Sequence, residues 1–476
     1  MSEKRFSISV TPIIVKREKL VSFSLFVNGL IMVMNTSMFT VAIPTIAQGY
    51  QISPSMAAWM VTSYSVFFAI GTLLYGRMTV FFSVPNLIST GLGLLGVGSV
   101  LGMVTDSYLL LVLVRVIQAL GMSAISALGI VIVSWHFPKE SRIRALATIA
   151  SASVLGFGLG PLVGGLVSDY LGWRYLFTIS LIGVLTLPVY RRFIPNTKPV
   201  NGQFDGVGFV LFSTAVISLL LTVSSGILWF LLGLICFPLF FIHIQSKEQP
   251  FLSLSLLIDN IYQKALYLAF SIFFIHFSIL FITPLLLVNV HERNMSFIGW
   301  ILFFGALASS FLMKWIGRVV DVIGVLFIIG LSTVCMATAT FLYSGLSSHN
   351  AFFITLFFFI SSTGFSCITL GMSTFITRYM PAERLTAGYG TMQLIQFFGG
   401  AFGVAVAGNM LDSEIASQKT WNPLWLGSGQ AYSNAYFILF IVALLAFAVY
   451  IRFYANAKRV SYIQSKSNSQ MKSESQ

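Results

Sequence analysis

One arginine and one histidine lie deep inside apolar stretches of this sequence and could carry a positive charge near neutral pH. Arg115 stands about eight residues into an apolar stretch over 107–133, and Gln118 follows it by three residues. Residues three apart face the same side of a helix. In lipid, a charged side chain costs at least a few kcal/mol and needs a polar partner or a wet cavity. The pair therefore predicts a polar transport cavity, and a snorkelling arginine is the weaker interpretation.

Carboxylates are absent from the middle of every apolar stretch, because all 14 Asp and Glu residues fall in loops or at the ends of stretches. Proton coupling ordinarily uses an intramembrane carboxylate. His276 is then the remaining candidate proton carrier, since an imidazole titrates near neutrality. A hydrogen-bonded structural histidine is the alternative interpretation. The other polar candidates for the cavity are Asn28, Asn35, Gln393 and Gln396.

The composition requires a membrane around these residues. Of 476 residues, 57% are hydrophobic and 9% are charged, whereas soluble domains carry roughly 25% charged residues. The mean hydropathy is +0.90. A soluble enzyme is excluded, and the net charge of +13 is attributed to cytoplasmic loops rather than to nucleic-acid binding. The three cysteines lack the spacing of metal ligands, and we expect no metal and no cofactor.

Apolar stretches between polar, Gly or Pro clusters predict fourteen membrane helices. They lie at about 20–43, 56–75, 85–104, 107–133, 143–168, 174–194, 207–223, 226–245, 263–288, 296–316, 323–344, 349–376, 386–410 and 432–455. With both termini in the cytoplasm, 23 of the 27 Lys and Arg residues fall inside. Cytoplasmic loops carry an excess of Lys and Arg, so this bias supports both the helix count and the orientation.

The order of helices predicts an all-α polytopic membrane protein with two six-helix bundles and two extra central helices. A cytoplasmic segment, 1–19, precedes the first bundle, 20–194. Two linker helices, 207–245, separate it from the second bundle, 263–455. A tail rich in Ser, Lys and Gln, 456–476, is predicted to be disordered. Two repeated bundles around a midplane site are typical of secondary transporters.

Several motifs carry a family resemblance. The fourth predicted helix contains Arg115, Gln118 and Gly121, and the fifth contains Gly156, Gly160, Pro161, Gly164 and Gly165. Further matches are Val41–Pro44, Trp59, Tyr64, Trp173 and Arg174, with Gly317, Asp321 and Gly324 in the second half. With the fourteen-helix layout, these motifs resemble the major facilitator superfamily, and within it the fourteen-helix drug:proton antiporters, which include tetracycline efflux proteins. The resemblance implies the major-facilitator fold, an antiporter motif on helix 5 and loop gating by Arg77 and Asp321.

The sequence departs from this family at three acidic positions. Asn35 stands where the family has Asp on helix 1, and the loop 76–80 lacks the usual acid. The stretch 397–400 replaces the region that carries a Glu in tetracycline exporters. The resemblance therefore favours efflux, while the coupling mechanism stays open.

We expect a non-enzymatic membrane transporter that exports hydrophobic or amphipathic small molecules by alternating access. A proton-independent facilitator or lipid-handling transporter of the same fold is the alternative, and a non-transporting sensor is a further one. The expected partners are a small-molecule substrate, the lipid bilayer and, as an open question, protons as coupling ion, without nucleic acid. The expected location is the cell membrane, as a monomer with both termini cytoplasmic. No P-loop is present, which argues against ATP-driven transport.

Overall fold

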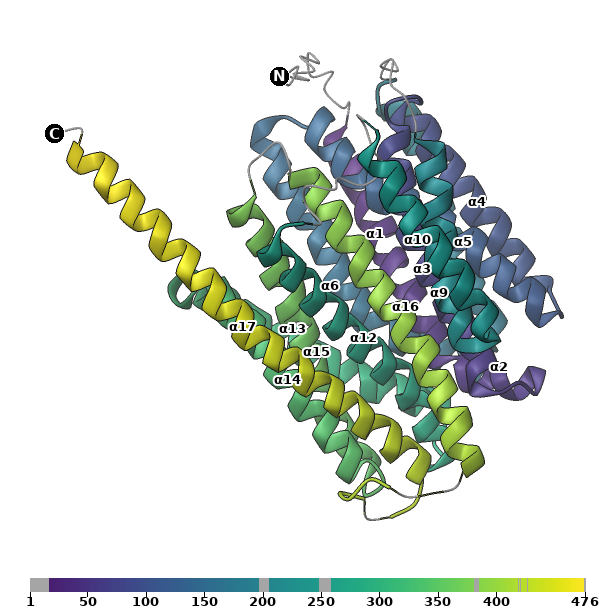
Figure 1. The fold of residues 1–476 in the computed structure, drawn as a ribbon. Helices are drawn as coiled ribbons and strands as arrows, with labels where there is room; N and C mark the ends of the chain where they lie inside the picture. Colours follow the sequence, from purple (N-terminus) through teal and green to yellow (C-terminus); the bar gives the residue numbers. More distant parts are fainter. Residues whose placement is uncertain are drawn as a thin grey trace. The chain divides into compact units, whose positions relative to one another are not determined.

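The structure is a computed structural model that describes residues 17–196, 205–247, 258–380, 385–417, 419, 421–425 and 427–474. Every regular element within these ranges is helical (Figure 1). The elements up to residue 193 are α1 (Glu18–Val41), α2 (Ile43–Tyr50), α3 (Pro54–Met78), α4 (Val84–Val104), α5 (Tyr108–His136), α6 (Lys139–Tyr170), the 3-10 turn η1 (Trp173–Tyr175), α7 (Leu176–Val184) and α8 (Leu187–Phe193).

The remaining elements begin at residue 206. They are α9 (Gly206–Ser225), α10 (Ile227–Gln245), α12 (Asn260–Asn289), α13 (Met295–Ile323), α14 (Val325–Leu346), α15 (Ala351–Tyr379), α16 (Leu385–Ser417) and α17 (Gln430–Glu474). Fourteen helical segments of the described chain are long and apolar enough to cross a bilayer, which confirms the predicted number. The sixth span is interrupted, because η1, α7 and α8 together form it.

Contacts divide the chain into two compact units. Unit 1 comprises Met1–Asn35, Gly71–Phe157 and Phe177–Gly202, and unit 2 comprises Thr36–Ile70, Gly158–Leu176 and Gln203–Gln476. The division cuts through α1, α3 and α6. Unit 2 therefore combines parts of α1, α3 and α6 with the helices from α9 onward. The bundles 20–194 and 263–455, defined by helix order, stay a prediction.

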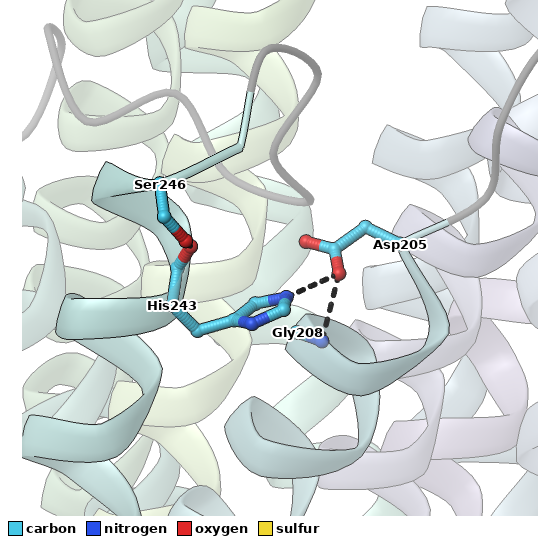
Figure 2. Close-up of polar contacts among 4 residues, drawn as sticks. All are labelled: Asp205, Gly208, His243 and Ser246. Atoms are coloured by element: carbon cyan, nitrogen blue, oxygen red, sulfur yellow. Dashed lines mark hydrogen bonds and ion pairs between the residues drawn. The ribbon is translucent and has the colours of Figure 1, made fainter.

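The two linker helices pack against each other as a hairpin (Figure 1). Gly226 joins them with a φ of 97°, a backbone conformation that favours glycine. At the other end of the hairpin, His243 Nε2 lies 2.7 Å from Asp205 Oδ1, and the same carboxylate oxygen accepts the Gly208 amide at 2.9 Å (Figure 2). Asp205 thus caps α9 and ties α10 to its first turn.

Side-chain caps also define where two helices of the second half begin. Asp259 accepts the amides of Ile261 and Tyr262 at the start of α12, and Asn350 accepts the amide of Phe352 at the start of α15. Such caps satisfy backbone donors that have no partner within the helix. The span formed by α12 is 94% buried, so this helix forms the centre of unit 2.

The C-terminal helix reaches into the segment 456–476, whose predicted disorder stays a prediction. Helix α17 continues through this segment to Glu474 as one helix of 45 residues (Figure 1). The segment 456–474 contains neither Gly nor Pro, and it includes Ala, Lys, Gln and Glu, which favour helix. A polar composition excludes a packed core here, but it does not prevent a helix from extending past its apolar part.

Candidate functional site

Arg115 lies at the centre of a hydrogen-bonded network in unit 1. Its side chain is fully buried on α5. Nη1 donates to the Asn35 side-chain oxygen and, at 3.0 Å, to Gln118 Oε1, while Nη2 donates to the Asn35 carbonyl oxygen at 3.2 Å. The planar guanidinium supplies several donors in fixed directions. The structure therefore brings together Arg115, Gln118 and Asn35, three residues singled out in the sequence.

The network extends to two more helices through the amide side chains. Gln118 Nε2 donates to Ser99 Oγ on α4 at 2.9 Å, and Asn35 Nδ2 donates to Ser180 Oγ on α7 at 2.7 Å. Ser99 and Ser180 are fully buried. Four helices are thus joined by neutral hydrogen-bond partners around one cation. The two serines were not predicted, since nothing in their spacing separates them from the other serines of these helices.

Asn28 forms a second polar contact within unit 1, two helical turns before Asn35 on α1. Its Nδ2 donates to Thr186 Oγ1 at 2.7 Å and to Tyr190 Oη at 3.2 Å. Asn28 and Tyr190 are fully buried. These contacts join α1 to α8 and its N-cap, so the geometry gives Asn28 a structural connection in addition to its predicted place in a cavity.

The glycines of α6 make close helix–helix contacts on different neighbours. A Cβ built on Gly156 would lie 2.8 Å from Val33 Cβ of α1, and one built on Gly164 would lie 2.7 Å from Met38 Cα. A Cβ on Gly165 would lie 2.9 Å from Gly299 Cα of α13. Small residues permit such approach. Gly160 and Pro161 of the same motif are buried, and the Pro161 carbonyl also lies against Gly299.

His276 lies in unit 2 among aromatic rings. Its Nδ1 is 3.0 Å from Ser361 Oγ of α15, and its ring stacks on Phe365 at a centroid distance of 4.3 Å and an angle of 17°. The side chain is 3% exposed. Its hydrogen-bond partner in this structure is a hydroxyl, the kind of contact expected of a structural histidine. Whether it carries a proton stays a prediction.

A continuous series of aromatic contacts, which we call the aromatic chain, links four helices of unit 2. The ring centroids of Phe68 of α3 and Phe397 of α16 are 4.7 Å apart. Those of Phe397 and Phe273 of α12 are 6.3 Å apart, and those of Phe273 and Phe365 of α15 are 4.7 Å apart. His276 stacks on Phe365 at its end. Phe397 is half-buried and the other phenylalanines are buried. The sequence contains 45 Phe residues, and no spacing distinguishes these four.

The remaining predicted site residues belong to α3, α13 and α16. Gln396 is 8% exposed, and Gln393 is half-buried on the same helix, α16. Arg77 is exposed in the last turn of α3. The side chain of Asp321 lies outside the described residues. Among the side chains that the structure describes, no three His, Cys, Asp or Glu residues are grouped so that they could hold a metal ion.

Comparison with known proteins identifies relatives of this fold. The model of the Major Facilitator Superfamily matches residues 25–404. The riboflavin transporter RibZ of Clostridioides difficile (strain 630) is 27% identical over 275 residues, which cover 56% of this chain and 60% of that protein. The multidrug resistance protein Stp of Mycobacterium tuberculosis (strain CDC 1551 / Oshkosh) is 25% identical over 405 residues, which cover 82% of this chain and 74% of that protein.

Solved structures show the same fold at low sequence identity. A crystal structure of the peptide transporter POT in complex with sulfate has a TM-score of 0.66 and 14% identity, over 93% of this chain and 97% of that chain. An inward-facing bacterial homolog of the human lysosomal transporter Spinster has a TM-score of 0.59 and 16% identity, over 92% of this chain and 97% of that chain. These likenesses establish the predicted major-facilitator architecture.

Proposed function

Because this chain belongs to the Major Facilitator Superfamily, we propose that it is a transporter that exports hydrophobic or amphipathic small molecules by alternating access. A relative named as a multidrug resistance protein supports this substrate class. The excess of Lys and Arg on one side supports a location in the cell membrane with both termini in the cytoplasm. The chain is proposed to act as a monomer surrounded by lipid.

The aromatic chain of unit 2 is the observation that carries the proposed substrate class. Its rings come from α3 of the first predicted bundle and from α12, α15 and α16 of the second. Aromatic rings bind other rings in stacked and edge-to-face arrangements, with about 0.5–1.5 kcal/mol per pair beyond the area that they bury. A half-buried ring such as Phe397 is suited to exchange one of its ring contacts for a planar substrate.

Transport of an aromatic dye by inverted membrane vesicles tests this proposal. We expect Phe397→Ala to raise the KM for the dye by about 2- to 10-fold, the range that follows from the loss of one ring contact. Phe353→Ala is the matched control, because Phe353 is 53% exposed on a helix of the same unit. An unchanged KM in Phe397→Ala, or an equal change in the control, would contradict a role of the aromatic chain in binding.

The proposal includes export that does not require a proton gradient. The residue that accepts hydrogen bonds from Arg115 on α1 is Asn35, an amide that does not titrate. The alternative is that His276 carries the coupling proton, because its imidazole has a ring nitrogen that can bind one. Dye export measured with and without a collapsed gradient separates the two, as developed in the Discussion.

A second candidate function is transport of a planar heteroaromatic molecule of the flavin type. The relative RibZ is named a riboflavin transporter, and rings of the aromatic chain together with His276 and Ser361 offer both stacking surfaces and hydrogen-bonding groups. Accumulation of labelled riboflavin in intact cells, against a strain without the protein, tests this candidate. Accumulation indicates uptake and depletion indicates export. No change in either direction would reject riboflavin as a substrate.

A further inference from the structure

Two helices of unit 2 begin with matching residues. Helix α3 starts after Ser53, whose side-chain oxygen lies 3.4 Å from the Met56 amide that donates to it. Helix α13 starts after Asn294, whose side-chain oxygen accepts the Phe297 amide at 3.1 Å. In both helices the second residue is a serine, the fifth is small and the sixth is tryptophan. These residues are Ser55, Ala58 and Trp59 in α3, and Ser296, Gly299 and Trp300 in α13.

Two other helices of the same unit carry a matching glycine and aspartate. Gly165 and Asp169 are four residues apart on α6, and Gly408 and Asp412 are four residues apart on α16. Residues four apart lie on the same face of a helix. Each glycine and its aspartate therefore lie on the helix face that packs against one neighbouring helix.

Each aspartate contacts the second residue of the facing helix. Asp169 Oδ2 accepts a hydrogen bond from Ser296 Oγ at 2.6 Å, and both carboxylate oxygens of Asp412 lie 3.3 Å from the Ser55 backbone nitrogen, which donates to them. A carboxylate at a helix N-terminus is stabilised by the free amides and the helix dipole.

The two glycines place the helices close enough for these contacts. A Cβ on Gly165 would lie 2.9 Å from Gly299 Cα, and one on Gly408 would lie 2.9 Å from Ser55 Cα and from Ala58 Cβ. The small residue one turn into each facing helix, Gly299 in α13 and Ala58 in α3, is thus the residue that the glycine contacts. The two contacts are the same arrangement built twice.

The arrangement is reciprocal between the two predicted bundles. Asp169 belongs to the first bundle and contacts the start of α13 in the second, whereas Asp412 belongs to the second bundle and contacts the start of α3 in the first. All four segments lie in unit 2. Repeats related by a pseudo-two-fold axis place equivalent contacts on the same side of a membrane. Both lie near the loops opposite the predicted cytoplasmic termini, which makes this the outer side.

We propose that the Asp169–Ser296 and Asp412–Ser55 contacts are a paired latch, which holds the two bundles together on the outer side and must open when substrate is released there. This inference rests on the proposed transport by alternating access. Each carboxylate at a helix N-terminus favours the closed arrangement by roughly 2- to 5-fold, and the two together by roughly 3- to 30-fold. Such a latch holds the side closed and still opens within a transport cycle.

The accessibility of one cysteine tests the latch without any substrate. Thr62 is 1% exposed and donates to the Ala401 carbonyl oxygen of α16 at 3.3 Å, below the Asp412 contact on α3. Thr62→Cys, in a chain whose three native cysteines are replaced by alanine, is labelled with a membrane-impermeant maleimide added from the outer side. We expect Asp169→Asn and Asp412→Asn each to speed labelling by about 2- to 5-fold, and the double variant by about 3- to 30-fold.

Glu414→Gln is the matched control for the loss of a carboxylate. Glu414 lies on α16 two residues after Asp412, but its contacts are Trp421 and Asn434, both of the second bundle. In the Glu414→Gln variant, the labelling rate of Thr62→Cys should equal that of the parent. An unchanged rate in the double variant, or an equal increase in Glu414→Gln, would overturn the latch. Because no substrate is used, these outcomes do not depend on whether aromatic compounds are exported.

Disulfide cross-links provide a second test, in which a reversible covalent bond replaces each contact. Asp169→Cys with Ser296→Cys, and separately Asp412→Cys with Ser55→Cys, place a thiol pair across each contact. Oxidation should lower the transport rate by at least 10-fold, and a reductant should restore the rate. Full transport by a protein that is completely cross-linked at either position would show that the contact stays closed throughout the cycle, and the latch would be rejected.

Discussion

Replacement of Arg115 provides the most direct test of the network in unit 1. Arg115→Ala removes the donors to Asn35 and Gln118, two side chains that are fully or nearly fully buried. A buried acceptor that loses its donor costs about 1–3 kcal/mol, so two such acceptors cost about 2–6 kcal/mol. Removing a buried charge offsets part of this cost. A net loss of about 1.4 kcal/mol already corresponds to a tenfold change in an equilibrium constant. We therefore expect the export rate to fall by at least 10-fold.

Arg115→Lys separates charge from geometry. An ammonium group has the same charge but lacks the planar fork that reaches Asn35 and Gln118 together. We therefore expect Arg115→Lys to recover less than a tenth of the lost rate. Dye export by inverted vesicles gives the rate, and gel filtration in detergent shows whether each variant folds.

Two further measurements decide whether the network or the charge matters. Arg192→Ala is the control, since Arg192 is exposed in the same unit, and it should export at the parent rate. In a double-mutant cycle, Arg115→Ala and Gln118→Ala should be coupled by about 0.5–3 kcal/mol, as expected of residues in one network. Full export by a folded Arg115→Ala protein would refute the reasoning and reduce Arg115 to a packing residue.

Three further predictions concern coupling and packing. Dye export should persist after the proton gradient is collapsed. If export instead depends on the gradient, His276→Gln should abolish that dependence, and export that still depends on the gradient in His276→Gln would contradict both alternatives. Asn35→Asp places a carboxylate beside Arg115, with an attraction of roughly 4 kcal/mol at 4 Å and an effective dielectric constant of 20. This energy corresponds to a factor of up to about 10³, so the variant should slow export by at least 10-fold if this contact opens during the cycle, and an unchanged rate would show that the contact stays closed. Gly156→Ala should lower the melting temperature, because its Cβ would lie 2.8 Å from Val33 Cβ, whereas Gly158→Ala has open space and should not lower it.

The Arg115 network was predictable in part from the sequence. A buried charge in a membrane helix requires polar partners, and Gln118 is three residues away on the same face. Asn35 was identified through its position relative to the family motif, since its helix is about 80 residues away in the chain. Local spacing predicts partners on one helix, while partners on other helices depend on packing.

The glycines of α6 show where sequence reasoning ends. They form one dense motif, and the sequence predicts close approach for all of them. The structure places Gly156 and Gly164 against α1 but Gly165 against α13, while a Cβ built on Gly158 would meet no atom of another helix within 4 Å. These differences arise from the 100° rotation between successive residues and from which helix lies at each angle. The same limit applies to His276, whose partner Ser361 lies 85 residues away.

The placement of charge separates two kinds of interaction in this protein. The buried cation on α5 is hydrogen-bonded by the amides of Asn35 and Gln118, groups whose hydrogen bonds do not change with pH in the physiological range. The carboxylates of Asp169 and Asp412 lie instead at the starts of helices, where free amides and hydroxyls meet them. Each carboxylate contact consists of one or two hydrogen bonds, whereas a buried network of several hydrogen bonds costs more to break. A cycle that opens the outer side is therefore expected to begin at the helix ends while the Arg115 network keeps its own four helices together.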